Sequence, residues 1–202
     1  MRLLISFFLI INLFGCVVPE ASHVVPDYFL LSPELIDRNS SSNNSSFSFY
    51  LKEVEIPEFL NDPRLVMRPE KLTVKFRENK RWGEPLEDGI SRVLSANLAS
   101  RLGTNFYSVF PNRRKKDLNW DISLTVLSFN RIGESTVEIE ALWELSNSNS
   151  DLRRDRFSYS KLLDNNDSES IDSEVLALSD CLAELSVEVA NEINDLVGDP
   201  GN

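Results

Sequence analysis

The sequence predicts an α+β fold, a two-layer α/β sandwich in which two amphipathic helices pack on one face of a mainly antiparallel sheet. Segments 86–102 and 171–196 space their apolar residues at the 3.6-residue period of a helix. Several other segments alternate apolar and polar residues, as strands covered on one side do. The chain has no internal repeat and no strand–helix alternation long enough for a doubly wound sheet.

The N-terminal end predicts a cleaved lipoprotein signal peptide. After Arg2, residues 3–14 form an apolar run that is too short for a spanning helix, which needs roughly 20 residues. The letters Leu-Phe-Gly-Cys at 13–16 resemble the lipobox of bacterial lipoproteins, which implies cleavage before Cys16 and acylation of its sulfur. Phe14 departs from the small residue usual at its position. An ordinary cleaved signal peptide and an uncleaved anchor are the alternatives.

Length and cysteine content predict one domain behind this anchor. The 202 residues, 42% hydrophobic and 26% charged, are typical of a single globular domain. We therefore expect residues 1–15 to be the signal peptide, 16–27 a lipidated tether and 28–198 the domain. Acylation of Cys16 would leave Cys181 without a partner for an intrachain disulfide, so we expect Cys181 to be a small buried apolar residue.

The first part of the domain is predicted to consist mainly of strands. We expect strands at 28–33, 49–57, 64–68 and 72–77, a short helical passage at 58–63, and a Ser/Asn-rich loop at 37–48. Within 49–57, the alternating pattern places Tyr50, Lys52, Val54 and Ile56 on one face.

The second part contains both helices. Pro85 suits the first turn of the helix at 86–102, and Gly103 stands where a left-handed C-terminal cap would lie. A short strand at 106–111 and a basic loop precede strands at 120–126, 137–145 and 156–161. The last helix begins near Ser170, with its outer side expected to carry Glu174, Asp180, Glu184, Glu188 and Glu192.

The composition excludes several classes of function. A formal net charge of −11 argues against nucleic acid as a ligand and against electrostatic docking of the whole protein on anionic lipid. The one histidine, His23, lies on the tether, where it is expected to be solvated, and the chain has no G-x-S-x-G elbow. Cys/His spacing for a metal and a glycine-rich phosphate loop are both missing. We expect a non-enzyme without cofactor or metal.

Three polar segments carry residues that could bind a partner. Trp82, in the stretch Arg-Trp-Gly-Glu-Pro-Leu, either seals the edge of the core or anchors a partner, with sealing favoured. Arg64 follows Asp62 in a turn and could simply pair with a nearby acid. The basic run 113–116 is interpreted as a solvated loop, with contact to lipid headgroups or to an acidic partner as the alternative.

These blocks together resemble the ABC-type transport auxiliary lipoproteins, the PqiC-like family. The resemblance covers residues 28–197 and is most specific in P-x-F-L-x-D-P-R-x-V-x-R at 57–68 and R-W-x-E-P-L at 81–86. The chain departs from the family pattern in the Ser/Asn-rich insertion at 39–46 and in the basic passage after Pro111. The second departure weakens any transfer of partner contacts to that loop.

The resemblance implies a periplasm-facing outer-membrane lipoprotein of a Gram-negative bacterium. Such proteins act with MCE-domain (mammalian cell entry) systems, which move lipids between the two membranes and maintain envelope integrity. Val17 and Val18 replace the aspartate associated with inner-membrane retention, which favours the outer membrane. A stand-alone lipid- or peptidoglycan-binding lipoprotein is the alternative, and the sequence leaves homo-oligomer formation open. The candidate partner-binding residues are Arg64, Arg81, Trp82 and Pro85.

Overall fold

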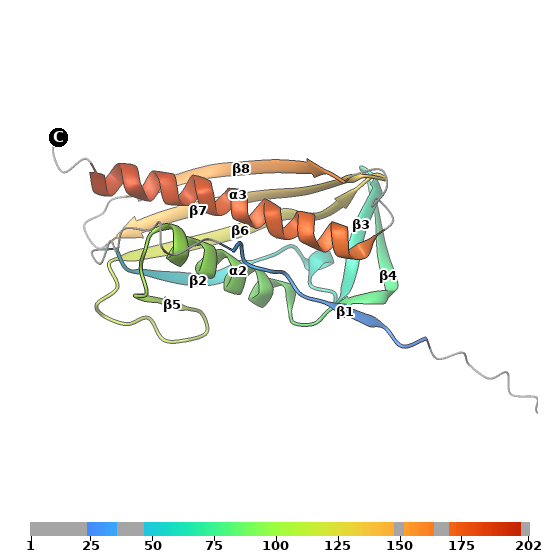
Figure 1. Ribbon diagram of the computed structural model, residues 1–202, viewed down its shortest axis with the longest axis horizontal. Coiled ribbons are helices and arrows are strands. Elements are labelled where there is room, and N and C mark those ends of the chain that lie inside the picture. The colour runs from blue at the N-terminus through green and yellow to red at the C-terminus, as the bar shows by residue number, and fades with distance from the viewer. Residues whose placement is uncertain (1–23, 36–46, 148–151, 164–169, 199–202) are drawn as a thin grey trace, which may run out of the picture.

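The computed structural model describes residues 24–35, 47–147, 152–163 and 170–198, and within them it confirms the predicted α+β class (Figure 1). Cys16, the signal peptide and residues 16–23 of the tether lie outside the described residues. The strands are β1 (Asp27–Phe29), β2 (Phe49–Glu55), β3 (Arg64–Glu70), β4 (Thr73–Trp82), β5 (Tyr107–Val109), β6 (Trp120–Ile132), β7 (Thr136–Asn147) and β8 (Leu152–Leu162). The helices are the 3₁₀ helix η3 (Glu58–Leu60), α2 (Leu86–Arg101) and α3 (Ile171–Gly198).

The long strand β6 organises the sheet. Along one side it pairs antiparallel with β7, which in turn pairs antiparallel with β8. These two ladders contain most of the paired residues of the sheet. Along the other side β6 pairs in parallel with β2 and then with β3. The antiparallel partner of β3 is β4, while β1 and β5 add parallel edges to β4 and β2. The sheet is therefore mixed, with its longest ladders antiparallel.

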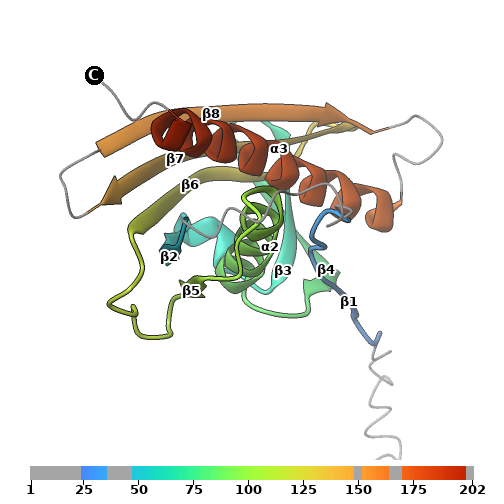
Figure 2. The ribbon, with the colours of Figure 1, turned by 60° about the vertical axis from the view of Figure 1, so that its left-hand side comes forward.

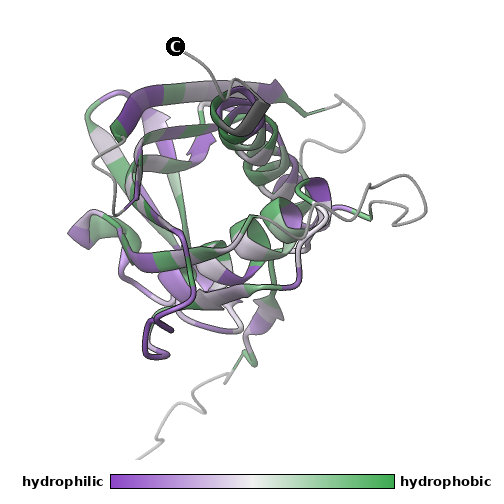
Figure 3. Ribbon diagram, turned by 90° about the vertical axis from the view of Figure 1, so that its left-hand side faces the viewer, coloured by the Kyte–Doolittle hydropathy of each residue, from purple (hydrophilic) through white to green (hydrophobic). Residues whose placement is uncertain are grey.

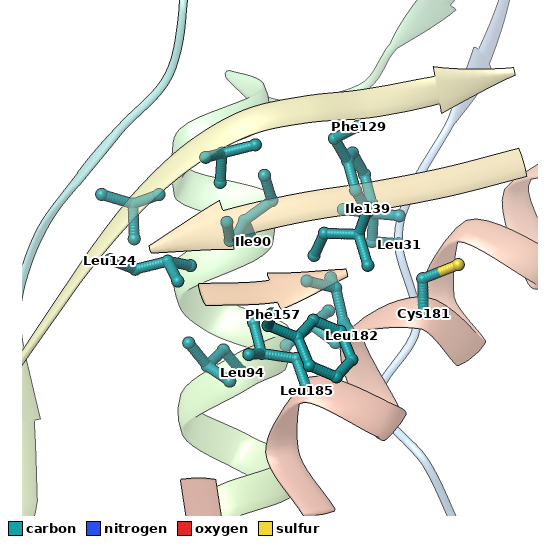
Figure 4. Packing of buried hydrophobic residues seen from close by; sticks show 14 of the residues in the cluster. Leu31, Ile90, Leu94, Leu124, Phe129, Ile139, Phe157, Cys181, Leu182 and Leu185 are labelled. Carbon is teal, nitrogen blue, oxygen red and sulfur yellow. The ribbon is translucent and has the colours of Figure 1, made fainter. Parts of the chain in front are cut away.

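Both helices lie on the same side of this curved sheet, as predicted (Figures 2 and 3). Helix α2 packs against α3 and β2, and α3 packs against β7 and β8. Burial of each large apolar side chain between these layers is worth about 1.5–3 kcal/mol. Residues that meet there include Ile90 and Leu94 of α2, Leu182 and Leu185 of α3, and Leu124, Phe129, Ile139 and Phe157 of the sheet (Figure 4).

Strand β2 forms as predicted, but its buried residues do not follow the simple alternation of Tyr50, Lys52, Val54 and Ile56. Phe49 and Leu51 are buried, whereas Tyr50 and Lys52 are only partly covered. The pairing of β2 with β6 shifts between Leu51 and Val54, so that Val54 is buried as well. An irregularity of this kind breaks the period of two on which an alternation pattern depends.

The ends of the elements follow local backbone chemistry more closely. Pro85 has extended backbone angles as the N-cap of α2, and Gly103 has φ of 62° directly after the helix, as its predicted cap requires. Strand β4 extends to Trp82, which therefore ends a strand rather than standing in a loop. Because β4 continues beyond the predicted end at residue 77, Arg81 and Trp82 lie in the strand, four and three residues before the N-cap of α2.

Glu174 does not lie on the outer side of α3, as the periodicity predicted. Its side chain is 0% exposed and its carboxylate accepts hydrogen bonds from Arg77 (2.8 Å) and Arg131 (3.3 Å). Arg77 comes from β4 and Arg131 from β6, so the first turn of α3 is joined by charge to two strands.

Candidate functional site

The fold brings the four candidate partner-binding residues together at one edge of the sheet. Arg64 begins β3 and lies opposite Arg81 near the end of the antiparallel strand β4. Trp82 follows, and its backbone N–H donates to the carbonyl oxygen of Pro63 at 2.7 Å. Pro85 then caps α2. The sequence blocks 57–68 and 81–86 are thus brought together by the hairpin of β3 and β4.

A groove of about 340 Å³ lies between these two blocks. Of the four candidates, Trp82 and Pro85 line it, whereas Arg64 and Arg81 are not among its lining residues. One wall is the segment from η3 to β3, and the other is the connection from β4 into α2. Its lining residues are Leu60, Asn61, Asp62, Pro63, Trp82, Gly83, Glu84, Pro85, Leu86 and Glu87.

Trp82 seals the core edge and also forms part of the groove. Its side chain is 8% exposed and belongs to the main apolar cluster, which supports the favoured interpretation from sequence. The adjoining Gly83 donates its N–H to the carbonyl oxygen of Phe29 at 2.8 Å. A Cβ at Gly83 would lie 3.1 Å from a methyl carbon of Leu30, so a larger residue would press on the β1 segment.

Arg64 is engaged within the protein and holds one wall of the groove in place. Its guanidinium donates to both carboxylate oxygens of Asp62, at 2.8 and 2.9 Å, and to Glu78 at 2.6 Å. It also lies over the ring of Phe76, 4.6 Å from the ring centre. Of the two interpretations from sequence, a partner contact or a pair with a nearby acid, the structure therefore shows the second for Arg64. Arg64 shapes the groove through Asp62.

The same contact controls the charge of the groove wall. The Arg64 guanidinium, a hydrogen-bond donor to Asp62, lowers the pKa of this carboxyl group from 3.8 to about 2. A carboxyl group with a depressed pKa in the folded protein stabilises the fold above its unfolded pKa, and this stabilisation is lost as pH falls through the folded value.

We expect Asp62→Asn to lower the free energy of unfolding by about 1 kcal/mol at pH 7, a value reduced from the full linkage because the pair is partly solvated. The difference from the unsubstituted protein should shrink as pH falls below about 4 and vanish only below the folded pKa of about 2. Urea unfolding across this range measures it. A difference of equal size at both ends of the range would show that the ion pair is not its cause.

The groove combines an apolar floor with an acidic rim. Leu60, Trp82 and Leu86 are buried at its base. Glu84 is paired with Arg92 at 2.5 Å, whereas in the described part of the chain no ion pair involves Glu87. A segment with an apolar side chain next to a basic one would complement this surface.

Three features of the described ranges bear on metal binding, membrane insertion and thiol reactivity. No group of three or more His, Cys, Asp or Glu side chains is placed there to hold a metal ion. Among those same residues, no helix combines the length and apolar character needed to cross a membrane. The Cys181 thiol is buried, and burial raises its pKa to about 12, which keeps it in the unreactive protonated form.

Sequence reasoning missed one surface feature. Phe106 and Phe110, at the ends of the segment expected to be a strand, are exposed next to the basic loop. The sequence carries the signal as two aromatic residues and a basic run within about ten positions, and neither the strand pattern nor the charge run reveals it alone.

Comparison with known proteins gives a family and a fold. The family model described as "ABC-type transport auxiliary lipoprotein component" matches residues 29–190. An uncharacterized protein of solved structure matches with a TM-score of 0.69 at 21% identity, covering 84% of this chain and 99% of its own. Protein XCC0632 from Xanthomonas campestris matches with a TM-score of 0.66 at 12% identity, covering 83% and 94%. Comparison with curated proteins found no match.

Proposed function

This chain belongs to the ABC-type transport auxiliary lipoprotein family, and we propose on that premise that it docks an MCE-type lipid transport system at the outer membrane. The observation that carries the proposal is the family match over residues 29–190, which includes both walls of the groove. The protein would act by binding and positioning its partner. Energy for lipid movement would come from a separate ATPase of the same transport system.

Cys16 would hold the domain at the periplasmic face of the outer membrane through its acyl chains. Cys16 precedes Asp27, the first residue of β1, by 11 residues. A chain of that length spans at most about 40 Å, so the domain would stay close to the bilayer surface. The valines at 17 and 18 support the outer rather than the inner membrane as the destination.

The groove would receive a segment of the MCE-domain protein. Trp82 contributes a rigid aromatic wall, and interface energy concentrates on such residues. Pro85 and Gly83 form the exposed rim, while Glu87 offers a carboxylate to a basic residue of the partner. Arg64 contributes indirectly, by holding the Asp62 carboxylate of the groove wall, and Arg81 lies opposite it in the β3–β4 ladder.

We expect Glu87→Lys to weaken co-purification with the MCE-domain protein about tenfold or more, because like charges would then face each other across the interface. The matched control is Glu184→Lys, on the exposed side of α3, which should co-purify as the unsubstituted protein does. Thermal unfolding of both variants checks that each is folded.

Equal association of the two variants would remove the groove from the interface. Trp82→Ala is a poorer probe, because emptying a core site of this size costs about 3–5 kcal/mol and would change folding and docking together. Phospholipid that remains bound to the delipidated protein in native mass spectrometry would favour a stand-alone carrier instead.

A further inference from the structure

We propose that Phe106, Phe110, Arg113, Lys115 and Lys116 form a basic–aromatic patch that rests on the phospholipid bilayer in which Cys16 is anchored. The inference rests on the membrane anchoring proposed above and adds a second contact with the same membrane. The patch would also fix how the domain is oriented.

Two exposed phenylalanines give the patch its apolar part. Phe106 is 64% exposed and Phe110 is 42% exposed, at either end of the edge strand β5. Large aromatic side chains placed on a surface in this way mark an interaction site, and Phe is among the residues that enter the headgroup region of a bilayer.

Three cations give the patch its charge. Arg113, Lys115 and Lys116 are exposed, and among the described residues none of them takes part in an ion pair. Asp117 is the one exposed acid beside them. The net charge of −11 does not cancel this local field at the bilayer, because charges are screened beyond about 8 Å at physiological ionic strength. Phosphate groups of lipid headgroups complement such a patch.

The patch is built on a braced loop. Arg114 donates to Asp121 at 2.6 Å and to the carbonyl oxygen of Leu118 at 2.7 Å. The backbone N–H of Phe110 donates to the carbonyl oxygen of Leu51 at 2.9 Å. These contacts fix the loop before any lipid is met, which lowers the entropy cost of binding.

The patch lies on the same side of the molecule as strand β1, the first strand after the tether. In Figures 1 and 2 the loop after β5 and strand β1 both lie low in the view, below β8, with the loop toward the left and β1 toward the right. The connection from β4 into α2, one wall of the groove, lies on this side too (Figure 1). Because the 11 residues from Cys16 to Asp27 can span up to about 40 Å, one bilayer can hold the anchor and meet the patch, with the groove close to the surface where a transported lipid would enter or leave.

A site-directed fluorophore tests this contact in the acylated full chain. Phe106→Cys is labelled with a polarity-sensitive dye and reconstituted into vesicles of phosphatidylethanolamine and phosphatidylglycerol. Cys181 does not compete for the dye, because its side chain is 0% exposed. Leu162→Cys is the matched control, since Leu162 is an exposed apolar residue, 74% accessible, at the end of β8.

We expect nitroxide-labelled lipid to quench the dye at position 106 by about twofold or more, because a patch residue would lie within about 10 Å of the headgroup–acyl boundary. The dye at position 162 should not be quenched. Reversing all three charges, Arg113→Glu, Lys115→Glu and Lys116→Glu, should abolish quenching at 106 while the acylated chain still floats with the vesicles.

Flotation without quenching at 106 would overturn the patch and leave the anchor at Cys16 intact. Charge reversal that leaves quenching unchanged but weakens co-purification with the MCE-domain protein would show that the patch binds an acidic partner. Association with that protein is measured separately, so a failure of the docking proposal is not confused with a failure of this one.

Discussion

Replacing Cys16 with alanine should abolish acylation and remove the protein from the outer-membrane fraction. Each buried CH₂ of an acyl chain contributes about 0.8 kcal/mol, so loss of the acyl groups removes far more binding energy than the basic–aromatic patch could supply. The apolar run at 3–14 is too short to replace the anchor by spanning the bilayer. Incorporation of labelled palmitate and density fractionation of the two membranes measure the effect.

Cys181→Ala is the matched control for this experiment. Cys181 is buried in α3, so its replacement should leave both acylation and fractionation unchanged. If Cys16→Ala remained in the outer-membrane fraction, the anchor would lie elsewhere in the chain, and the proposed orientation, which assumes an anchor ahead of β1, would lose its basis.

The two helices could be predicted because the information that specifies them is local. The apolar spacing from Leu86 onward and the glycine at 103 determine where α2 begins and ends. The pairing of strands is not local. β1 pairs with β4 through Asp27 and Lys80, which are 53 positions apart, and no spacing rule within either segment reveals such a partner.

The groove shows the same division. Asp62 and Arg64 are close in sequence, so their ion pair could be anticipated as an alternative. Glu78, the second partner of Arg64, becomes its neighbour only when β3 and β4 form a hairpin. The polar residues around Trp82 predict a loop, whereas the structure places it at the end of β4, paired with Phe29 of β1 and buried in the core cluster.

The buried position of Glu174 lies outside what a helical pattern can predict, and it carries a large consequence for stability. Its carboxylate is shared by the guanidinium groups of Arg77 and Arg131, whose side chains are only 16% and 10% exposed. Removing one member of a buried ion network leaves charges that water cannot reach to solvate. Such a loss costs far more than the pair contributes by its own attraction.

Glu174→Ala should therefore lower the free energy of unfolding by about 3–5 kcal/mol, whereas Glu184→Ala, exposed on the same helix, should change it by less than about 0.5 kcal/mol. Urea unfolding followed by circular dichroism measures both. Adding Arg77→Leu to Glu174→Ala should restore part of the loss, because one uncompensated charge is removed with its partner. If Glu174→Ala and Glu184→Ala lowered the free energy of unfolding equally, water would reach the ion network of Glu174, and α3 would be held on the sheet by apolar packing alone.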